Sequence, residues 1–473
     1  MNFETALSKD KIFSVVKQSA KNLGLETYIV GGYVRDLILN RASKDIDFVC
    51  VGSGITLANE VSKNLKNQKV SVFKNFGTAM LTSGDWELEF VGARKESYHR
   101  NSRKPIVEDG TLADDQNRRD FTINAMAISL NTDNYGELVD PFGGVKDLKK
   151  KIIRTPLDPN ITFSDDPLRM MRAIRFSSQL GFDIAPDTFE AITENVDRLE
   201  IISQERIIDE LNKIILSNRP SYGFKLLFYA GILKKIFPEM VALHGVETIG
   251  KKSHKDNFYH TLQVLDNISQ VTDDLWLRWA AILHDIAKPN TKRFNNKVGW
   301  TFHGHEDKGA RMVPGIFRRM KLPLNEHMKF VQKLVLLHLR PIALVKKEVT
   351  DAAIRRLLFE AGDDVKSLMM LCRADITSKN HIKVDRFLKN FDAVEKKMEE
   401  VEARDSITNM QPIITGEIIM ETFNIKPSKV IGDIKEQLKN AILDGKIKNT
   451  KEEAFPYMIE IAAKMGINLV GSS

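Results

Sequence analysis

Cysteine is scarce in this chain of 473 residues, which contains only Cys50 and Cys372. Two cysteines cannot build the disulfide framework of a small secreted domain, so the sequence favours a reducing compartment, the cytoplasm. Long apolar runs are also missing, because even the most apolar segment, LWLRWAAILHDIA, is short and interrupted by charges. We therefore expect no transmembrane helix. The first residues, MNFETALSKDKIF, lack the basic and apolar regions of a signal peptide, and none is expected.

Acidic residues are outnumbered by basic ones, 63 against 70, which gives a formal net charge of +7. This excess favours a polyanionic partner, although many basic proteins bind no nucleic acid. The chain is too long for one ordinary hydrophobic core, so two to four domains are expected. Internal repeats and low-complexity tracts are absent from the sequence.

The order of sequence patterns predicts an α+β fold, in which a mixed sheet with helices is followed by an all-helical remainder. Expected helices cover residues 8–23 and 55–67, and expected strands cover 27–32, 45–51, 69–73, 77–83 and 86–93. The polar segment 95–117 has no period and predicts a long mobile loop. From Arg118 onward the pattern is almost entirely helical.

Two aspartates, Asp45 and Asp47, lie one residue apart in the predicted strand DIDFVCV. Residues i and i+2 of a strand face the same side, so Ile46 and Phe48 would point into the core instead. Two adjacent carboxylates repel each other unless a cation lies between them. Hard oxygen ligands of this kind suit Mg²⁺ that also contacts phosphates. The alternative is an exposed acidic pair at the edge of a strand.

Two glycines, Gly31 and Gly32, precede this strand at a predicted strand-to-helix turn. Without side chains, their backbone N–H groups can approach phosphate oxygens, and the helix that follows adds positive potential. Arg35 lies within one turn of the glycines and is a candidate phosphate ligand. The alternative is a plain Gly-Gly turn.

Five motifs follow one another at a characteristic spacing: GGYVRD with KDIDF, RRDFTINAMA, VDPFGGVKDL, DDPLRMMRAIRF and SQERIIDELNKII. Over residues 27–217 this order resembles the class II tRNA nucleotidyltransferases and bacterial poly(A) polymerases, which have a polymerase-β-like head. The resemblance implies that Asp45 and Asp47 bind two magnesium ions and are the catalytic acids. Glu89, on a neighbouring strand, is a candidate third ligand; the alternative is a polar edge residue.

The segment RRDFTINAMA has apolar positions that could dock it on the sheet, while its polar residues stay accessible. The family resemblance implies that Arg118 and Asn124 contact the triphosphate or the ribose. It also implies that Arg119 and Asp120 brace the site, and that DPFGG, residues 140–144, is a flexible hinge.

Asp166 and Arg169 are three residues apart, and with Ser164 as a helix cap they would share one helix face. An ionised Asp only accepts hydrogen bonds and an Arg only donates them. Cytosine and adenine each present an amino group beside an acceptor nitrogen, whereas uracil and guanine present the reverse. This pair could therefore select C and A without a nucleic-acid template, or it could be an ordinary helical salt bridge. Arg172 and Arg175 continue the face and could reach phosphate or brace Asp166.

The family's EDxxR element occupies the same position and favours base recognition. This sequence has Asp165 where that element usually has Glu, a conservative departure that leaves Asp166 and Arg169 in place.

Over residues 254–380, the order of histidines and aspartates along the chain resembles that of the HD-domain metal phosphohydrolases. The resemblance implies a one-metal ligand set of His260, His284, Asp285 and Asp375. His305 and His338 would extend this set to a second metal, and His303 competes with His305 for that role. Imidazole with carboxylate suits a transition metal such as Ni²⁺, Mn²⁺ or Co²⁺. A lone histidine near an apolar run is more often a core residue, and HD domains can be vestigial.

The last helical segment resembles the C-terminal part of the same nucleotidyltransferases. It is basic through six lysines: Lys426, Lys429, Lys435, Lys439, Lys446 and Lys448. These lysines could contact the tRNA backbone, or they could form an ordinary solvated face.

Together these features predict four parts: a nucleotidyltransferase head (1–155), a helical neck that recognises the base (156–235), an HD body (236–400) and a tRNA-binding tail (401–473). The expected activity is addition of C, C and A to the 3′ end of tRNA from CTP and ATP, with metal-dependent phosphate hydrolysis in the HD part. The alternatives are a poly(A) polymerase, an enzyme that adds only part of CCA, an HD phosphohydrolase with a non-catalytic RNA-binding head, and a non-catalytic RNA-binding protein. The sequence does not define the oligomeric state.

Overall fold

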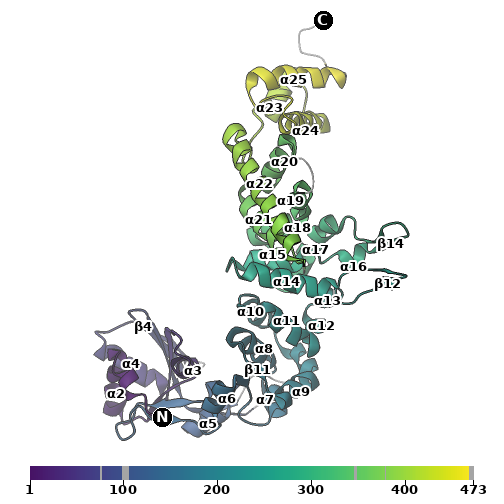
Figure 1. Cartoon of the computed structure of the whole chain (residues 1–473). Coiled ribbons are helices and arrows are strands. Elements are labelled where there is room, and N and C mark those ends of the chain that lie inside the picture. Colours follow the sequence, from purple (N-terminus) through teal and green to yellow (C-terminus); the bar gives the residue numbers. More distant parts are fainter. Residues whose placement is uncertain (75–76, 98–105, 346–348, 379, 468–473) are drawn as a thin grey trace. The chain divides into compact units, whose positions relative to one another are not determined.

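The computed structural model describes residues 1–74, 77–97, 106–345, 349–378 and 380–467 (Figure 1). The chain divides into two compact units, Met1–Val241 and Ala242–Ser473. Within the described residues, no helix combines the length and the apolar content that crossing a bilayer requires.

A seven-stranded sheet forms the centre of the first unit, in the order β3–β4–β5–β2–β1–β8–β9. The strands are β1 (Thr27–Val30), β2 (Asp45–Cys50), β3 (Val70–Phe73), β4 (Thr78–Ser83), β5 (Trp86–Gly92), β8 (Ala127–Ser129) and β9 (Leu138–Val139). Strands β2 and β5 are parallel, and the other neighbours in this sheet are antiparallel. The sheet is therefore mixed, and the predicted fold class is confirmed.

Alternation along β2 decides which side chains reach the core. Ile46 and Phe48 are fully buried, and the Phe48 ring stacks on Phe90 of β5 with centroids 4.9 Å apart. Helix α4 (Gly54–Asn64) packs on β2, β4 and β5, and α2 (Lys11–Leu23) packs on α4 (Figure 1). Because side chains of a strand alternate, Asp45 and Asp47 lie on the opposite face of the sheet from Ile46 and Phe48.

Two expectations about the segment after β5 were wrong. The part of residues 95–117 that the structure describes is not a loop, because β6 (Arg94–Ser97) pairs with β7 (Ile106–Asp109) and α5 (Leu112–Asn117) follows. Residues 98–105 lie outside the described residues. The chain after Arg118, expected to be almost entirely helical, also contains β8 and β9, which complete the sheet and were not predicted. A short, fully buried apolar run does not distinguish a strand from a helix.

Helices make up most of the rest of the first unit. They are α1 (Glu4–Leu7), α3 (Gly32–Ile38), α6 (Gly144–Lys150), α7 (Pro159–Asp165), α8 (Leu168–Leu180), α9 (Pro186–Asn195), α10 (Gln204–Ile215), α11 (Pro220–Tyr229), α12 (Ile232–Ile236) and α13 (Pro238–Val241). Two short strands, β10 (Ile152–Ile153) and β11 (Asp183–Ile184), join the start of this helical region to the end of α8. Helix α8 packs on α10 and α11, which fixes its position in the unit.

Among the described residues of the second unit, the strands form two short hairpins, β12 (Thr248–Ile249) with β13 (Lys252–Ser253) and β14 (Arg293–Asn295) with β15 (Gly299–Thr301), and the other elements are helices. Its helices are α14 (Asn257–Ser269), α15 (Leu275–Leu283), α16 (Lys288–Thr291), α17 (His305–Arg319), α18 (Glu326–Leu337), α19 (Leu339–Leu344), α20 (Asp351–Ala361), α21 (Val365–Ala374), α22 (His381–Asp405), α23 (Gly416–Phe423), α24 (Lys429–Leu443) and α25 (Lys451–Lys464). Helices α14, α15, α18 and α21 pack on one another, and α23, α24 and α25 share a separate apolar cluster.

Candidate active and metal sites

Three carboxylates lie on one face of the sheet in the first unit. In the parallel pair β2–β5, Asp47 stands opposite Glu89, and Asp45 precedes Asp47 on the same face. Burial raises the pKa of Asp47, and Asp45 adds to this increase while Arg119 opposes it. Burial and then Asp47 raise the pKa of Glu89. The structure therefore brings the two predicted catalytic acids and the candidate third ligand together, in a region where negative charges repel.

The turn before α3 lies directly against these acids. Gly31 precedes the helix with φ of 75°, in the region that favours glycine. A Cβ atom at Gly31 would lie 3.0 Å from Asp47 Oδ2 and 3.3 Å from Arg119 Nη1. Only glycine fits this position without displacing a side chain of the site, and Gly32 then begins α3.

A buried aspartate that the sequence analysis missed holds the two arginines of RRDF. Asp115 of α5 is fully buried and forms ion pairs with Arg118 and, at 2.9 Å, with Arg119. Although burial opposes ionisation, Arg119 and then Arg118 lower the pKa of Asp115. The i, i+3 and i, i+4 spacing of these residues was the available signal, but it was hidden because the segment was predicted to be a loop.

A second network joins α3, the RRDF segment and α8. Arg35 donates from Nε to Asp36 Oδ1 at 2.9 Å and from Nη1 to Asn124 Oδ1 at 3.0 Å, and Asn124 Nδ2 donates to Asp120 Oδ1 at 3.1 Å. Arg172 donates from Nε and Nη2 to Asp120 Oδ2, at 2.8 and 2.6 Å. Although burial opposes ionisation, Arg172 and the hydrogen bonds lower the pKa of Asp120 to about 2. Asp120 is therefore a buried anion that connects α8 to the head.

The two residues predicted to read the base lie beside this network, but not as predicted. Ser164 belongs to α7, and Asp166 lies between α7 and α8 in an extended conformation, so the expected Ser164 cap and shared helix face are wrong. The reason is Pro167, since a proline disfavours helical backbone at the residue before it. The two residues are still one turn apart, because Arg169 N donates to Asp166 O at 3.0 Å.

The arginines of α8 contact different partners. Arg169 donates from Nη2 to the backbone oxygen of Arg118 at 2.6 Å. Arg175 Nε lies 2.7 Å from Glu210 Oε2 of α10, and its guanidinium lies over the Phe176 ring, 4.1 Å from the centroid. That Arg175 reaches phosphate or braces Asp166 stays a prediction; in this structure its guanidinium pairs with the buried Glu210.

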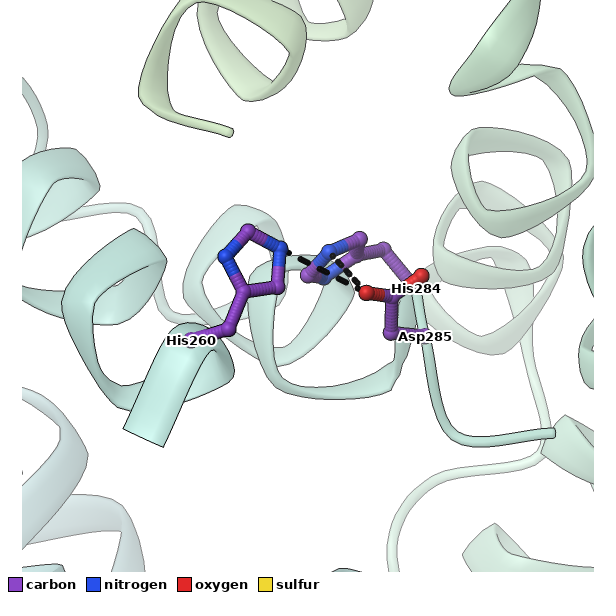
Figure 2. Close-up of side chains that lie close together, drawn as sticks. All are labelled: His260, His284 and Asp285. Carbon is purple, nitrogen blue, oxygen red and sulfur yellow. Dashed lines mark ion pairs between the residues drawn. The ribbon is translucent and has the colours of Figure 1, made fainter. Parts of the chain in front are cut away.

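The second unit contains a cluster of imidazoles around one carboxylate (Figure 2). Asp285 Oδ2 lies 3.4 Å from His260 Nε2 and 3.2 Å from His284 Nε2, and both rings point toward it. Asp375 Oδ1 lies 2.9 Å from His260 Nε2 and 3.6 Å from His284 Nε2. The four residues of the predicted one-metal set are therefore adjacent.

The other oxygen of Asp285 faces a second pair of imidazoles. Asp285 Oδ1 lies 3.2 Å from His305 Nε2 and 4.0 Å from His338 Nε2, and these two nitrogens are 3.3 Å apart. Two groups with metal-ligand spacing therefore share Asp285 as a common member. His303, the competing candidate, is exposed and is not part of either group.

Each ring is oriented by a contact at its other nitrogen. The Nδ1 partners are Thr377 Oγ1 for His260, Ala281 O for His284, Phe302 O for His305 and Val335 O for His338, all at 2.7–2.8 Å. A backbone carbonyl can only accept, so Nδ1 of the last three rings carries a proton, and Nε2 offers a lone pair whenever the ring is neutral. This is the arrangement in which histidine binds a metal.

The residues of the cluster fit a divalent cation. Within the described residues, His284 Nε2 is buried and makes no hydrogen bond of ordinary geometry, although Asp285 Oδ2 lies 3.2 Å from it. Although burial opposes a charge on His284, Asp285 and Asp375 raise its pKa to about 10, so the carboxylates stabilise positive charge at this point. Burial and then His284 lower the pKa of His338 to about 4, which keeps that ring neutral. Nitrogen and oxygen ligands without thiolate suit a transition metal.

Lys288 is a further charged residue at this cluster, and the sequence analysis missed it. Its Nζ lies 2.5 Å from Asp285 Oδ2, one helical turn after that residue. The signal was the i, i+3 spacing of an acid and a base.

The six tail lysines lie on α24 or next to it. Lys426, Lys429, Lys435, Lys446 and Lys448 are exposed, and Lys439 is half-buried over the Phe359 ring at 5.8 Å from its centroid. The predicted contact of this tail with tRNA stays a prediction.

Models of known protein families match most of the chain. A "Poly A polymerase head domain" matches residues 27–154, and a "Probable RNA and SrmB-binding site of polymerase A" matches 181–243. An "HD domain" matches 257–378, and a "tRNA nucleotidyltransferase domain 2" matches 319–455.

Three relatives define what this chain is similar to. A "Multifunctional CCA protein" of Shewanella frigidimarina is 35% identical over 312 residues, which are 64% of this chain and 71% of that protein. An "A-adding tRNA nucleotidyltransferase" of Deinococcus radiodurans is 29% identical over 90% of this chain and 93% of its own length. A protein of the same description from Aquifex aeolicus is 43% identical over 41% of this chain, but the match spans only 24% of that longer protein.

Solved structures share the fold. A "tRNA nucleotidyltransferase complexed with a primer tRNA and an incoming ATP analog" is 26% identical, with a TM-score of 0.54, over 80% of this chain and 98% of the other. A "CCA-adding enzyme apo form II" is 23% identical, with a TM-score of 0.65, over 98% of this chain and 99% of the other.

Proposed function

The chain belongs to the class II CCA-adding tRNA nucleotidyltransferases, and from this we propose that it adds C, C and A to the 3′ end of tRNA from CTP and ATP. The observation that supports the activity most directly is the set of acids, Asp45, Asp47 and Glu89, on one sheet face against the Gly31–Gly32 turn. The relatives named multifunctional CCA proteins favour complete CCA addition over poly(A) synthesis. Relatives named A-adding enzymes make addition of A alone the main competitor.

In the head, Asp45 and Asp47 would hold Mg²⁺, with Glu89 as a further ligand. Bound magnesium would polarise the α-phosphate, lower the pKa of the primer 3′-OH and stabilise the leaving pyrophosphate. Burial raises the pKa of Asp47 and of Glu89, and neighbouring acids add to this increase; a divalent cation would offset both effects by stabilising the ionised carboxylates.

The chain's own groups position the nucleotide. Without side chains at Gly31 and Gly32, backbone N–H groups of this turn can approach phosphate oxygens, and a Cβ atom at Gly31 would crowd Asp47. Arg118 and Arg119 are held by the buried Asp115, so their guanidinium groups keep one orientation and lose little entropy when they bind a triphosphate.

Base selection would come from Asp166 and Arg169. The carboxylate accepts from the amino group of cytosine or adenine, and the guanidinium donates to the adjacent ring nitrogen. Arg169 is anchored on the Arg118 backbone oxygen, which supports a fixed position for the donor. The Asp120–Arg172 pair would set the position of α8 relative to the head segments that hold the triphosphate.

We expect tRNA to bind through basic side chains, and the exposed lysines of the tail would contact the acceptor and T arms. We assign these roles to four parts of the chain: the nucleotidyltransferase head (1–155), the neck that recognises the base (156–235), the HD body (236–400) and the tRNA-binding tail (401–473). Both cysteines are free and buried, which supports a reducing, cytoplasmic compartment.

A second activity, metal-dependent hydrolysis of a phosphomonoester or a 2′,3′-cyclic phosphate, is favoured by the two ligand groups that share Asp285. The residues of the site would hold Ni²⁺, Mn²⁺ or Co²⁺, and a bound metal would lower the pKa of a coordinated water. His284 Nε2 is buried and faces Asp285 and Asp375 without a hydrogen bond of ordinary geometry, which supports a cation at this point.

The nucleotidyltransferase proposal is tested with a tRNA that ends before CCA and one labelled nucleotide at a time. CTP alone should add two residues, and ATP should be incorporated only after them. Incorporation of ATP alone on a tRNA that already ends in CC, with none of CTP on the shorter tRNA, would replace this proposal by the A-adding activity.

A further inference from the structure

Two hairpins of the second unit lie next to the candidate metal ligands along the chain. Hairpin β14–β15 falls between Asp285 and His305, and hairpin β12–β13 ends just before α14, which carries His260. Both hairpins project from the helices of this unit (Figure 1). Because Asp285 and His305 belong to one cluster, the chain that forms β14–β15 leaves this cluster and returns to it.

Contacts at both ends of β14–β15 fix the hairpin to the cluster. Before the hairpin, Lys288 Nζ lies 2.5 Å from Asp285 Oδ2 and 5.7 Å from the centroid of the Phe302 ring. After the hairpin, the backbone oxygen of Phe302 accepts a hydrogen bond from His305 Nδ1 at 2.7 Å. Lys288 and Phe302 therefore anchor the two strands beside the ligands.

The two hairpins form one surface. Lys252 of β13 donates from Nζ to the backbone oxygens of Asn296 and Lys297, in the turn of β14–β15, at 2.8 and 2.6 Å. His254, which directly follows β13, packs edge-on against Trp300 of β15, with 5.5 Å between the ring centroids. We call residues 246–255 and 288–303 the hairpin surface.

The hairpin surface is strongly basic. It contains seven lysine or arginine residues and one acid, Glu247, whereas the whole chain has 70 basic residues for 63 acids. Glu247 already pairs with Lys292, at 2.7 Å. Four basic residues of the surface are exposed, and within the described residues their side chains form no hydrogen bond or ion pair: Lys251, Lys255, Arg293 and Lys297. These cations are available to a polyanion.

The reach of the surface favours a chain of nucleotides over a single nucleotide. Lys297 lies five residues before Phe302, which corresponds to roughly 16 Å of extended strand. A mononucleotide whose phosphate lies at the cluster would not span this distance, whereas a strand has a phosphate at every step. Apolar side chains lie among the cations, since Val298 is 73% exposed and Ile249 46%. Cations beside apolar groups suit the phosphates and the unpaired bases of a single strand.

We propose that the hairpin surface binds single-stranded RNA and directs its 3′ end to the HD cluster. This inference rests on the proposed hydrolase activity and makes its substrate an RNA end instead of a free nucleotide. A 2′,3′-cyclic phosphate requires a ribose 2′ oxygen, so RNA is the nucleic acid that carries it. Hydrolysis adds one water across a P–O bond of the ring and leaves a monophosphate and one free ribose hydroxyl. The exposed cations would contact the phosphates that precede this end.

The test compares two substrates of the full chain with Ni²⁺ or Mn²⁺: an eight-nucleotide RNA that ends in a 2′,3′-cyclic phosphate, and 2′,3′-cyclic AMP. Hydrolysis reports only on RNA that reaches the HD cluster, so RNA bound elsewhere does not contribute. In wild-type protein, kcat/KM should be at least about tenfold higher for the RNA. Lys251→Ala/Lys297→Ala should lower this ratio about tenfold through KM for the RNA. The slope of log KM against log salt should fall by about 1.4, because two phosphate contacts are lost.

The matched control is Lys366→Ala/Lys396→Ala, which removes two exposed lysines of the same unit outside the hairpin surface. In this control the ratio should stay within about twofold of the wild-type value. Equal kcat/KM of wild-type protein for both substrates overturns the RNA surface, and so does an equal fall of the ratio in both double variants.

Two further outcomes are distinct from these. If Lys251→Ala/Lys297→Ala loses activity on both substrates in parallel, the hairpins are structural and the inference is overturned. If wild-type protein hydrolyses neither substrate, the hydrolase proposal fails together with this inference, and that result precedes any comparison of variants.

Discussion

Substitution of Arg172 by Met should destabilise the junction of α8 and the head, and the effect should depend on pH. Asp120 is 8% exposed and receives two hydrogen bonds from Arg172. Its pKa of about 2, compared with an ordinary value of 3.8, corresponds to roughly 2.5 kcal/mol of stability at neutral pH. The Arg172 side chain is 34% exposed, so solvent screens part of this interaction and we expect a loss of about 2 kcal/mol.

The sign of the pH dependence follows from the lowered pKa. A carboxyl group with a lowered pKa stabilises the folded protein above its unfolded pKa, and this contribution is lost as the pH falls through the folded value. The difference between wild type and Arg172→Met should therefore be full above about pH 4 and should shrink toward pH 2. Asp120→Asn combined with Arg172→Met should recover part of the loss, because no buried charge is left unpaired.

Hydrogen exchange of the α8 amides, followed by mass spectrometry, measures local unfolding of α8. It does not require two-state unfolding of the whole chain. At pH 6, protection in Arg172→Met should fall by roughly 30-fold, since 1.4 kcal/mol is a factor of ten. At pH 2.5 the difference should be clearly smaller. Lys63→Met, which breaks an exposed pair with Glu60, should change protection little. Equal protection at pH 6, or a difference that does not change with pH, would refute the assignment of Asp120 as a buried anion held by Arg172.

The remaining predictions concern the two sites. Asp45→Ala or Asp47→Ala should lower the rate of nucleotide addition by roughly two to three orders of magnitude or more while circular dichroism stays unchanged, and near-normal addition by either would contradict the metal assignment. Arg169→Ala should weaken the preference for CTP and ATP over UTP and GTP more than it weakens tRNA binding; kinetics with an unchanged preference would exclude this pair as the base reader. tRNA affinity should fall steeply with salt, and a minihelix without the anticodon arm should still be extended. The double variant His284→Ala/Asp285→Ala should abolish phosphate release that depends on Ni²⁺, Mn²⁺ or Co²⁺ and should leave nucleotide addition unchanged. If wild-type protein hydrolyses neither phosphomonoesters nor cyclic phosphates, the HD cluster is structural.

The sequence predicted those parts of the site that depend on short-range periodicity. The i, i+2 spacing of Asp45 and Asp47 in an apolar strand was enough to place both on one face, and the complete burial of the alternating residues Ile46 and Phe48 agrees. The sequence made Glu89 only a candidate third ligand, because the strand register that puts it opposite Asp47 depends on long-range pairing.

The errors came from local features that tertiary structure decides. Pro167 changed the backbone at Asp166, so a simple i, i+3 helical pair became a turn followed by a helix. Asp115 was missed because the polar residues around it were interpreted as a loop, whereas the capping box formed by Thr111 and Asp114 begins a helix there. That capping pattern was visible in the sequence, but the burial of Asp115 was not.

The histidine cluster shows both the strength and the limit of sequence order. Family resemblance indicated His260, His284, Asp285 and Asp375. His260 lies on α14, His284 and Asp285 directly follow α15, and Asp375 directly follows α21, so no periodicity could connect all four. The choice between His303 and His305 required the structure, because the two flank Gly304, the N-cap of α17, and only His305 lies in the helix and is buried. Lys288 was not found because a lysine three residues after an aspartate is common on any helix surface.

Product sequencing tests the central claim most directly. A tRNA transcript that ends before CCA is incubated with all four nucleotides and Mg²⁺, and the 3′ ends are sequenced over time for wild type and for Asp47→Asn. We predict that wild-type protein yields ends of C, then CC, then CCA, with no U or G and no longer products, and that Asp47→Asn leaves the transcript unextended. Runs of A, incorporation of U or G, or equal extension by Asp47→Asn would contradict the account.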